Sequence, residues 1–98
     1  MLLKAEAHGI EAERVDGMDF LAVHAAACRA IRKARDERRA QFLEMRCYRF
    51  VGHGVADNAQ QQRFYRTEEE IAEWKGRDPL ARLRNFLGSD GRDRKSVV

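Results

Sequence analysis

The sequence contains little proline, little cysteine and no long hydrophobic stretch. One of its 98 residues is proline and two are cysteine, while 44% are hydrophobic and 36% are charged. Apolar runs such as Ala25–Cys28 are only a few residues long, and Leu3 is followed at once by Lys4, so the sequence predicts neither a membrane span nor a secretory leader. This composition is typical of a folded, cytoplasmic protein without a membrane partner.

The two cysteines, Cys28 and Cys47, do not have the close spacing of a zinc site. Both lie in regularly patterned segments, which predicts reduced thiols buried in the core rather than catalytic nucleophiles or a disulfide. We therefore expect no metal site in this chain.

The formal net charge of +3 is small, and its origin is local. Six basic residues lie between positions 29 and 39, against two acidic ones: Arg29, Arg32, Lys33, Arg35, Arg38 and Arg39. A basic helix face can bind nucleic acid, but this segment lacks interleaved aromatic residues and is interrupted by acids. A solvated helix face is the favoured interpretation, and a small nucleic-acid-binding module stays open as the alternative.

The first half of the chain has the pattern of a strand, a helix and a second strand. Residues 13–17 form a short extended segment, and Asp19 is a plausible N-cap for a helix to about Arg38. The predicted apolar stripe of this helix consists of Phe20, Val23, Ala27, Ile31 and Ala34. Residues 41–51 alternate as in a second strand.

Strand, helix and strand in this order predict an α/β fold with a parallel βαβ unit. The two strand ends, 16–17 and 51–52, should then lie at one edge of the sheet, where open parallel sheets bind ligands. Two strands alone leave both sheet edges open, so we expect this chain to be a fragment or to complete its sheet with another polypeptide.

A long connection follows the second strand, from Gly52 to Arg66. Thr67 and Glu70 then form a capping box for a short helix, and Asp78 with Pro79 begins another. We expect residues 1–88 to belong to one domain and residues 89–98, which lack periodicity, to be a disordered tail.

The long connection and its flanks hold the candidate site residues. His53 lies between two glycines, where an imidazole can contact a phosphate or transfer a proton, although an ordinary loop histidine would have the same spacing. Arg49 could pair with a phosphate or with a structural carboxylate. Asp57, Tyr65 and Arg66 could order the loop or be solvated loop residues.

Several motifs in register resemble the alpha subunit of thiamine-diphosphate-dependent 2-oxo acid dehydrogenases, especially the pyruvate type. The main matches are Tyr48-Arg49-Phe50-Val51-Gly52-His53-Gly54-Val55-Ala56-Asp57, Tyr65-Arg66-Thr67-Glu68-Glu69-Glu70-Ile71, Trp74 and Arg77-Asp78-Pro79-Leu80. Upstream, Gly9-Ile10, Arg14-Val15-Asp16-Gly17-Met18-Asp19 and Leu21-Ala22-Val23 also match. The resemblance covers about residues 3 to 87.

This resemblance implies the C-terminal part of a thiamine-diphosphate-binding fold, with the βαβ unit followed by a long loop and two short helices. It implies an enzyme of two alpha and two beta subunits that oxidatively decarboxylates pyruvate and transfers the acyl group to a lipoyl-bearing acyltransferase. His53 matches the family's catalytic histidine beside the cofactor diphosphate. Arg49 matches a cofactor-binding position, and Asp57, Tyr65 and Arg66 match positions that order the loop.

The family's Gly-Asp-Gly motif, which holds magnesium and the diphosphate, is absent from this sequence. Magnesium would therefore be bound by residues outside this chain, and the chain alone is expected to be inactive. The position after His53 is Gly54, which cannot be phosphorylated as the serine of mitochondrial relatives is. Branched-chain 2-oxo acid and acetoin dehydrogenases remain alternatives within the family.

Overall fold

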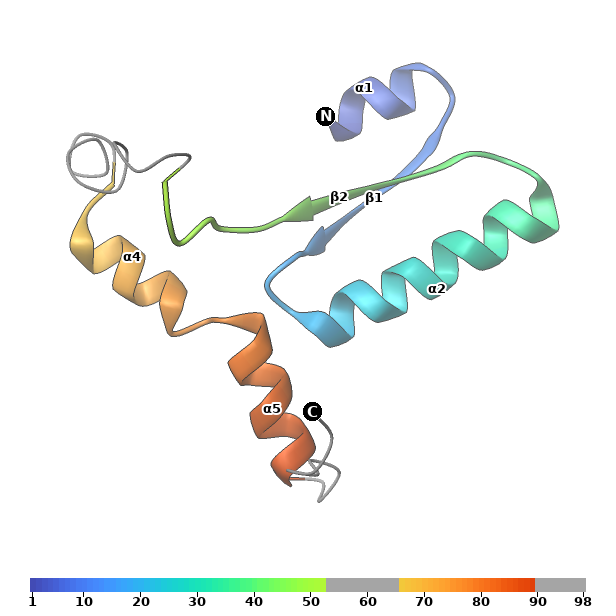
Figure 1. Ribbon diagram of the computed structural model, residues 1–98. Helices are drawn as coiled ribbons and strands as arrows, with labels where there is room; N and C mark the ends of the chain where they lie inside the picture. Colours follow the sequence, from blue (N-terminus) through green and yellow to red (C-terminus); the bar gives the residue numbers. More distant parts are fainter. Residues whose placement is uncertain (53–65, 90–98) are drawn as a thin grey trace. The chain divides into compact units, whose positions relative to one another are not determined.

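The structure, a computed structural model, describes residues 1–52 and 66–89 (Figure 1). The chain divides into two compact units, Met1–Cys47 and Tyr48–Val98. The first unit contains α1 (Leu2–Ala7), β1 (Glu11–Asp16), α2 (Phe20–Glu37) and β2 (Gln41–Arg46). None of the helices in the described ranges is long and apolar enough to cross a membrane.

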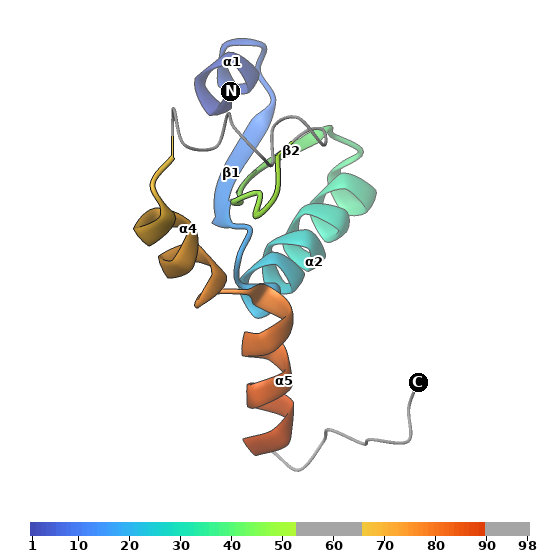
Figure 2. The same cartoon turned by 60° about the vertical axis from the view of Figure 1, so that its left-hand side comes forward.

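The two strands pair in parallel and in register, from Glu11 opposite Gln41 to Asp16 opposite Arg46. The connection between them is α2, which packs against both strands (Figures 1 and 2). Helix α1 lies on the opposite side of the strand pair (Figure 1). The predicted α/β fold with a parallel βαβ unit is confirmed.

Helix α2 begins and ends close to the predicted residues because its ends carry local signals. The Asp19 side chain accepts hydrogen bonds from the backbone N–H groups of Leu21 (3.1 Å) and Ala22 (3.2 Å), which would otherwise be unpaired at a helix start. At the other end Arg38 adopts the left-handed conformation, with φ of 51°.

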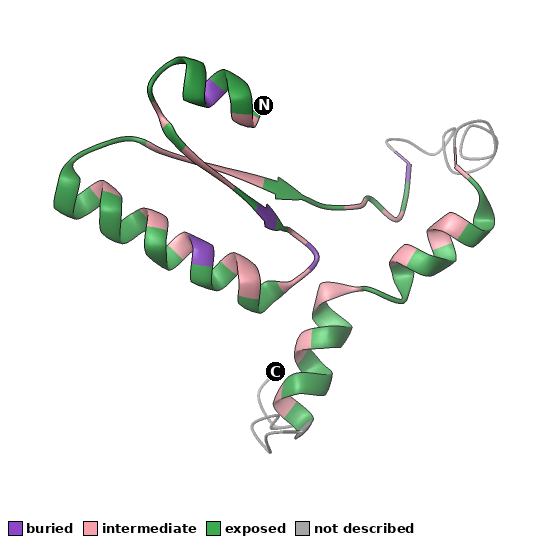
Figure 3. Cartoon of the chain, turned by 180° about the vertical axis from the view of Figure 1, so that it is seen from behind, coloured by how far each residue is buried: buried purple, intermediate pink, exposed green. Residues whose placement is uncertain are grey.

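The buried face of α2 differs from the predicted stripe. Ala26 is fully buried, whereas Phe20 and Ile31 of the predicted stripe are 48% and 50% exposed. The other stripe residues, Val23, Ala27 and Ala34, are half-buried, so the two strands cover part of the predicted face. The buried hydrophobic residues among the described positions are Ala5, Val15, Met18 and Ala26 (Figure 3).

Strand β2 is shorter than predicted. It ends at Arg46 rather than at Val51, because the register with β1 ends at Asp16 and the chain then turns at Gly17. Residues beyond Arg46 have no strand beside them to pair with in the described part of the chain. Alternation of side chains therefore predicted the position of the strand but not its length.

The predicted burial of the two thiols is wrong. Cys28 and Cys47 are both free and exposed. Cys28 lies on the outer side of α2, where its Sγ is 3.9 Å from His24 Nε2, and Cys47 follows the end of β2. Neither position is covered by a second layer in the first unit.

The second unit contains two short helices, α4 (Glu68–Lys75) and α5 (Pro79–Ser89). The Thr67 hydroxyl accepts a hydrogen bond from the N–H of Glu70 (3.1 Å), and the Asp78 carboxylate accepts one from the N–H of Leu80 (2.9 Å). Both predicted helix starts are therefore confirmed. Helix α5 ends at Ser89, one residue beyond the predicted end, and residues 90–98 lie outside the described part.

Helix α1 was not predicted, and it is attached to the strands through Glu44. The Glu44 carboxylate accepts hydrogen bonds from the backbone N–H of Leu2 (3.0 Å) and from Arg14 Nε (2.6 Å). The side chain of Glu44 is only 19% exposed. The hydrogen bond from Arg14, followed by that from Leu2, lowers the pKa of Glu44 to about 2.

Acidification should therefore weaken the first unit. The folded pKa of Glu44 lies below the value of 4.5 for a free glutamate, so its contribution is complete above about pH 4.5 and is lost as the pH falls to about 2. We expect NMR titration of the Glu44 carboxyl carbon to give a midpoint near 2. The Glu44→Gln variant should lose this part of the pH dependence, whereas Glu69→Gln, at an exposed site, should keep it. A midpoint near 4.5 for Glu44 would contradict the contact.

Gly17 is required by a close approach at the end of the strand pair. Its N–H donates to the Arg46 carbonyl (2.7 Å), and a Cβ at this position would lie 2.8 Å from the same oxygen. Real Cβ atoms do not approach a backbone oxygen so closely, so the turn would have to shift.

We expect Gly17→Ala to destabilise the strand pair by about 1–3 kcal/mol because the overlap involves backbone atoms that cannot move independently. Native-state amide hydrogen exchange of β1 and β2 measures this loss directly. The control is Gly88→Ala, since a Cβ on Gly88 meets no atom within 4 Å. Equal exchange in wild type and Gly17→Ala would be inconsistent with the described turn.

Candidate functional site

The candidate site begins at the carboxyl ends of the two strands. Asp16 and Arg46 are opposite each other in the last register position, and Gly17 is hydrogen-bonded back to Arg46. The Asp16 carboxylate accepts a hydrogen bond from the N–H of Met18 (2.9 Å), which turns the chain into α2. Both strands thus end at the same edge, as predicted, although β2 ends at Arg46 and not at residues 51–52.

Two predicted site residues contact each other in the second unit. The Arg66 guanidinium donates from Nη1 to the backbone carbonyl of Arg49. Arg66 is half-buried, and Arg49 is exposed. The contact joins the chain segment before residues 53–65 to the segment after them. The predicted site residues His53, Asp57 and Tyr65 lie outside the described residues.

The same two segments are also joined by ring contacts that the sequence did not predict. The rings of Tyr48 and Trp74 are stacked, with centroids 5.1 Å apart and planes inclined by 5°. The Cζ of Arg66 lies 5.1 Å from the Tyr48 ring centroid, and the Cζ of Arg77 lies 5.1 Å from that of Trp74. We call Arg66, Tyr48, Trp74 and Arg77 the aromatic stack.

The energies of such contacts are modest one by one. An aromatic pair contributes about 0.5–1.5 kcal/mol beyond its buried area, and an exposed cation over an aromatic ring contributes about 0.5–1 kcal/mol. The aromatic stack combines one ring pair with two such cations, and Arg77 is also held by Glu73 (3.2 Å). Two of these contacts, the ring pair with Trp74 and the Arg66 guanidinium, connect Tyr48 to the chain at and before α4. A signal was present in the sequence, because Trp74 is the sole tryptophan and lies eight residues after Arg66.

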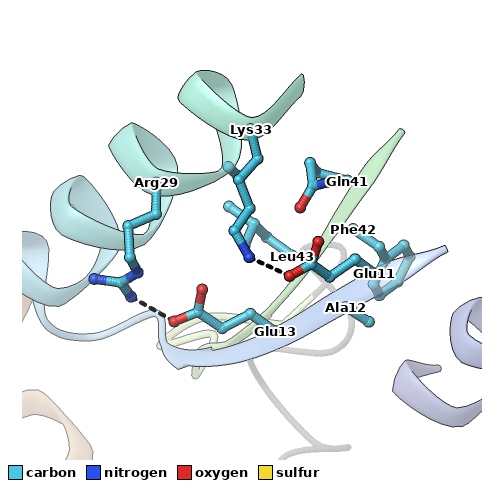
Figure 4. Close-up of a pocket in the computed structure, with 9 residues that line it drawn as sticks. Glu11, Ala12, Glu13, Arg29, Lys33, Gln41, Phe42 and Leu43 are labelled. Carbon is cyan, nitrogen blue, oxygen red and sulfur yellow. Dashed lines mark hydrogen bonds and ion pairs between the residues drawn. The ribbon is translucent and has the colours of Figure 1, made fainter. Parts of the chain in front are cut away.

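A small cavity lies in the first unit between α2 and the strand pair (Figure 4). Arg29 and Lys33, one helical turn apart on α2, reach Glu13 and Glu11, which are on one face of β1. The hydrogen bond that Lys33 Nζ donates to the Glu11 carboxylate lowers the pKa of Glu11 and raises the pKa of Lys33. At about 80 Å³ the cavity is well below the size of ligand pockets, which are typically about 300–1,000 Å³.

These ion pairs also bear on the basic segment. Arg29 and Lys33 are two of its six cations, and both pair with carboxylates of this chain (Figure 4) while their side chains stay 54% and 46% exposed. All six cations are exposed, as expected for a solvated helix face, and the pairing of two of them weakens the nucleic-acid alternative.

The predicted cofactor-binding residue Arg49 is accessible to solvent in the second unit. Arg49 provides an exposed guanidinium, which binds phosphate oxygens well. Within residues 1–52 and 66–89, no three histidine, cysteine, aspartate or glutamate side chains lie close enough to hold a metal ion.

Comparison with known proteins decides the family. The family model described as dehydrogenase E1 component matches residues 1–96. The chain belongs to the dehydrogenase E1 component family. No solved structure gives a significant match.

Two of the similar relatives in this family are both named pyruvate dehydrogenase E1 component subunit alpha. The protein from Staphylococcus aureus is 41% identical over 88 residues, and that from Porphyra purpurea is 38% identical over 84 residues. These alignments cover 90% and 86% of this chain and 23% of each relative.

A third relative has a different substrate in its name. The mitochondrial 2-oxoisovalerate dehydrogenase subunit alpha 1 of Arabidopsis thaliana is 37% identical over 92 residues, which is 93% of this chain and 19% of the relative. The 98-residue chain thus spans about a fifth to a quarter of the length of the curated relatives that it matches.

Proposed function

We propose that this chain forms part of the alpha subunit of a thiamine-diphosphate-dependent 2-oxo acid dehydrogenase of the pyruvate type. The observation that carries the proposal is the family match over residues 1–96, with relatives named as pyruvate dehydrogenase alpha subunits at 38% and 41% identity. The enzyme would oxidatively decarboxylate pyruvate and pass the acyl group to the lipoyl group of an acyltransferase. Its other subunit would be a dehydrogenase beta subunit.

The geometry of the first unit supports this proposal. Its two parallel strands end together at Asp16 and Arg46, and open parallel sheets bind ligands beyond such ends. The chain segment that follows β2 carries the residues with the proposed roles. Thiamine diphosphate, when bound, supplies the electron sink for loss of carbon dioxide from the 2-oxo acid.

The proposed roles of the site residues follow from their chemistry. His53 is the proposed catalytic residue, because an imidazole can donate to a diphosphate and move a proton near neutral pH. Arg49 is proposed to bind the diphosphate through its guanidinium. Arg66, with Asp57 and Tyr65, is proposed to order the segment between them, and its hydrogen bond to the Arg49 carbonyl supports this role.

We infer that these 98 residues alone are inactive. The Gly-Asp-Gly motif that would hold magnesium is not in the sequence, and the described residues form no acidic cluster that replaces it. Experiments on activity therefore use the alpha subunit that contains these residues, assembled with its beta subunit.

The His53→Ala variant of the assembled enzyme separates the two half-reactions. We expect acyl transfer to the lipoyl group to fall about 100-fold, the scale for loss of a proton-transfer group, with a much smaller loss of decarboxylation. Decarboxylation is measured with an artificial electron acceptor, and transfer with a lipoyl domain. The control is His24→Ala, an exposed histidine of α2, which should leave both rates unchanged. Equal losses in both half-reactions would refute the role of His53 in transfer.

A branched-chain 2-oxo acid or acetoin dehydrogenase is the second candidate. The 2-oxoisovalerate dehydrogenase relative, at 37% identity, favours the branched-chain member of this pair. Steady-state kinetics of the assembled enzyme with pyruvate and with 2-oxoisovalerate distinguishes them. We expect kcat/KM to be higher for pyruvate, and a preference for 2-oxoisovalerate would assign the branched-chain reaction instead.

A further inference from the structure

Helix α2 carries a histidine and a cysteine one turn apart on its outer side. The Sγ of Cys28 lies 3.9 Å from Nε2 and 4.0 Å from Nδ1 of His24. Both residues are exposed, and neither has a part in the proposed function. Side chains four residues apart on a helix are neighbours, so the backbone of α2 itself brings the two groups together.

The ring of Phe20 restricts the orientation of the imidazole. Phe20 lies one turn before His24, and the two rings are stacked, with centroids 6.3 Å apart and planes inclined by 20°. Phe20, His24 and Cys28 thus form a row along α2 at intervals of four residues. Because the stack orients the imidazole in advance, a ligand that binds it has less conformational freedom to remove.

The separation of the two groups fits one metal ion between them. Zinc binds a thiolate at about 2.3 Å and an imidazole nitrogen at about 2.0–2.1 Å, and tetrahedral angles then place sulfur and nitrogen about 3.6 Å apart. The observed distance between Cys28 Sγ and His24 Nε2 is 3.9 Å, so a small side-chain rotation suffices. Pairs of histidines with the same helical spacing bind zinc in other proteins.

We propose that His24 and Cys28 form a two-ligand site for a soft divalent cation such as Zn²⁺ or Co²⁺. One sulfur and one nitrogen, without a carboxylate, favour these ions over Mg²⁺ and Ca²⁺. Binding forms one metal–sulfur and one metal–nitrogen bond, displaces water from the cation and releases the thiol proton to solvent, with no change of oxidation state. Water fills the other coordination positions, because no three such side chains in residues 1–52 and 66–89 lie close enough to share an ion.

The prediction of no metal site rested on the spacing between the two cysteines. A histidine four residues before a cysteine is a different pair, and its two ligand atoms come together only when α2 is formed. A cation held by both groups therefore binds the folded helix in preference to the unfolded chain and stabilises the helix. The site takes no part in the proposed reaction, so His24→Ala remains a control there.

The first test adds Co²⁺ to the reduced 98-residue chain, because a cobalt–thiolate bond absorbs strongly in the near ultraviolet. We expect this absorption with one Co²⁺ per chain, and Zn²⁺ should displace the cobalt, whereas Mg²⁺ should not. Cys28→Ser should abolish the absorption. His24→Ala keeps the thiol but should weaken binding about 100-fold, since the second ligand otherwise binds within the same molecule.

The matched controls are Cys47→Ser and His8→Ala, which change the other exposed cysteine and another exposed histidine of the first unit. Both should keep the absorption and the affinity of the wild type. Circular dichroism should show the same helix content in every variant, because all four positions are exposed. Absorption that survives in Cys28→Ser, or equal affinity in His24→Ala and wild type, would overturn the site.

Amide hydrogen exchange tests whether the ion bridges the helical turn. With Zn²⁺ at about ten times its dissociation constant, amides at residues 24–28 should exchange about tenfold more slowly, while those of α4 should not change. The slowing should be absent in His24→Ala. Zinc binding without slower exchange in α2 would overturn the bridge. None of these measurements uses enzyme activity, so their failure would leave the proposed function standing, and failure of that function would leave the site standing.

Discussion

The parallel pairing of β1 with β2 is the constraint on which the first unit depends. Parallel strands cannot be joined by a tight turn, so the chain between them must cross over, and α2 is that crossover. The pairing also fixes where both strands stop. The N–H of Gly17 donates a hydrogen bond to the Arg46 carbonyl just after the last paired residues, and both strands end at the same edge of the sheet.

The strand pair is held by a small core and by charged contacts around it. The buried hydrophobic residues of the described chain are few, and two of the four are alanines. The ion pairs of Arg29 and Lys33 with β1 are partly exposed, and solvent-exposed pairs of this kind contribute little to stability. The Glu44 side chain is less exposed than these ion pairs. It accepts hydrogen bonds from the Leu2 N–H of α1 and from Arg14 of β1. The exposed apolar side chains of α2, such as Phe20 and Ile31, extend past what two strands can cover.

The second unit is organised by side chains rather than by a sheet. Beyond Arg46 the chain has no strand partner in the described residues, and the aromatic stack together with the Arg66 hydrogen bond supplies its main attachments. Contacts of this kind join segments that are distant in sequence at a few points only.

Features that depend on neighbouring residues were predictable from the amino-acid sequence. The caps at Asp19, Thr67 and Asp78, the order of strand and helix, and membership in the family were all legible there, because caps and periodicity act over a few residues. Helix α1 was missed because no side chain caps its start. Only the tertiary structure decided that β2 stops at Arg46, that Ala26 is covered, that both cysteines are exposed and that Tyr48 stacks on Trp74. Each of these outcomes depends on which distant segment lies alongside, and the local pattern contains no information about that neighbour.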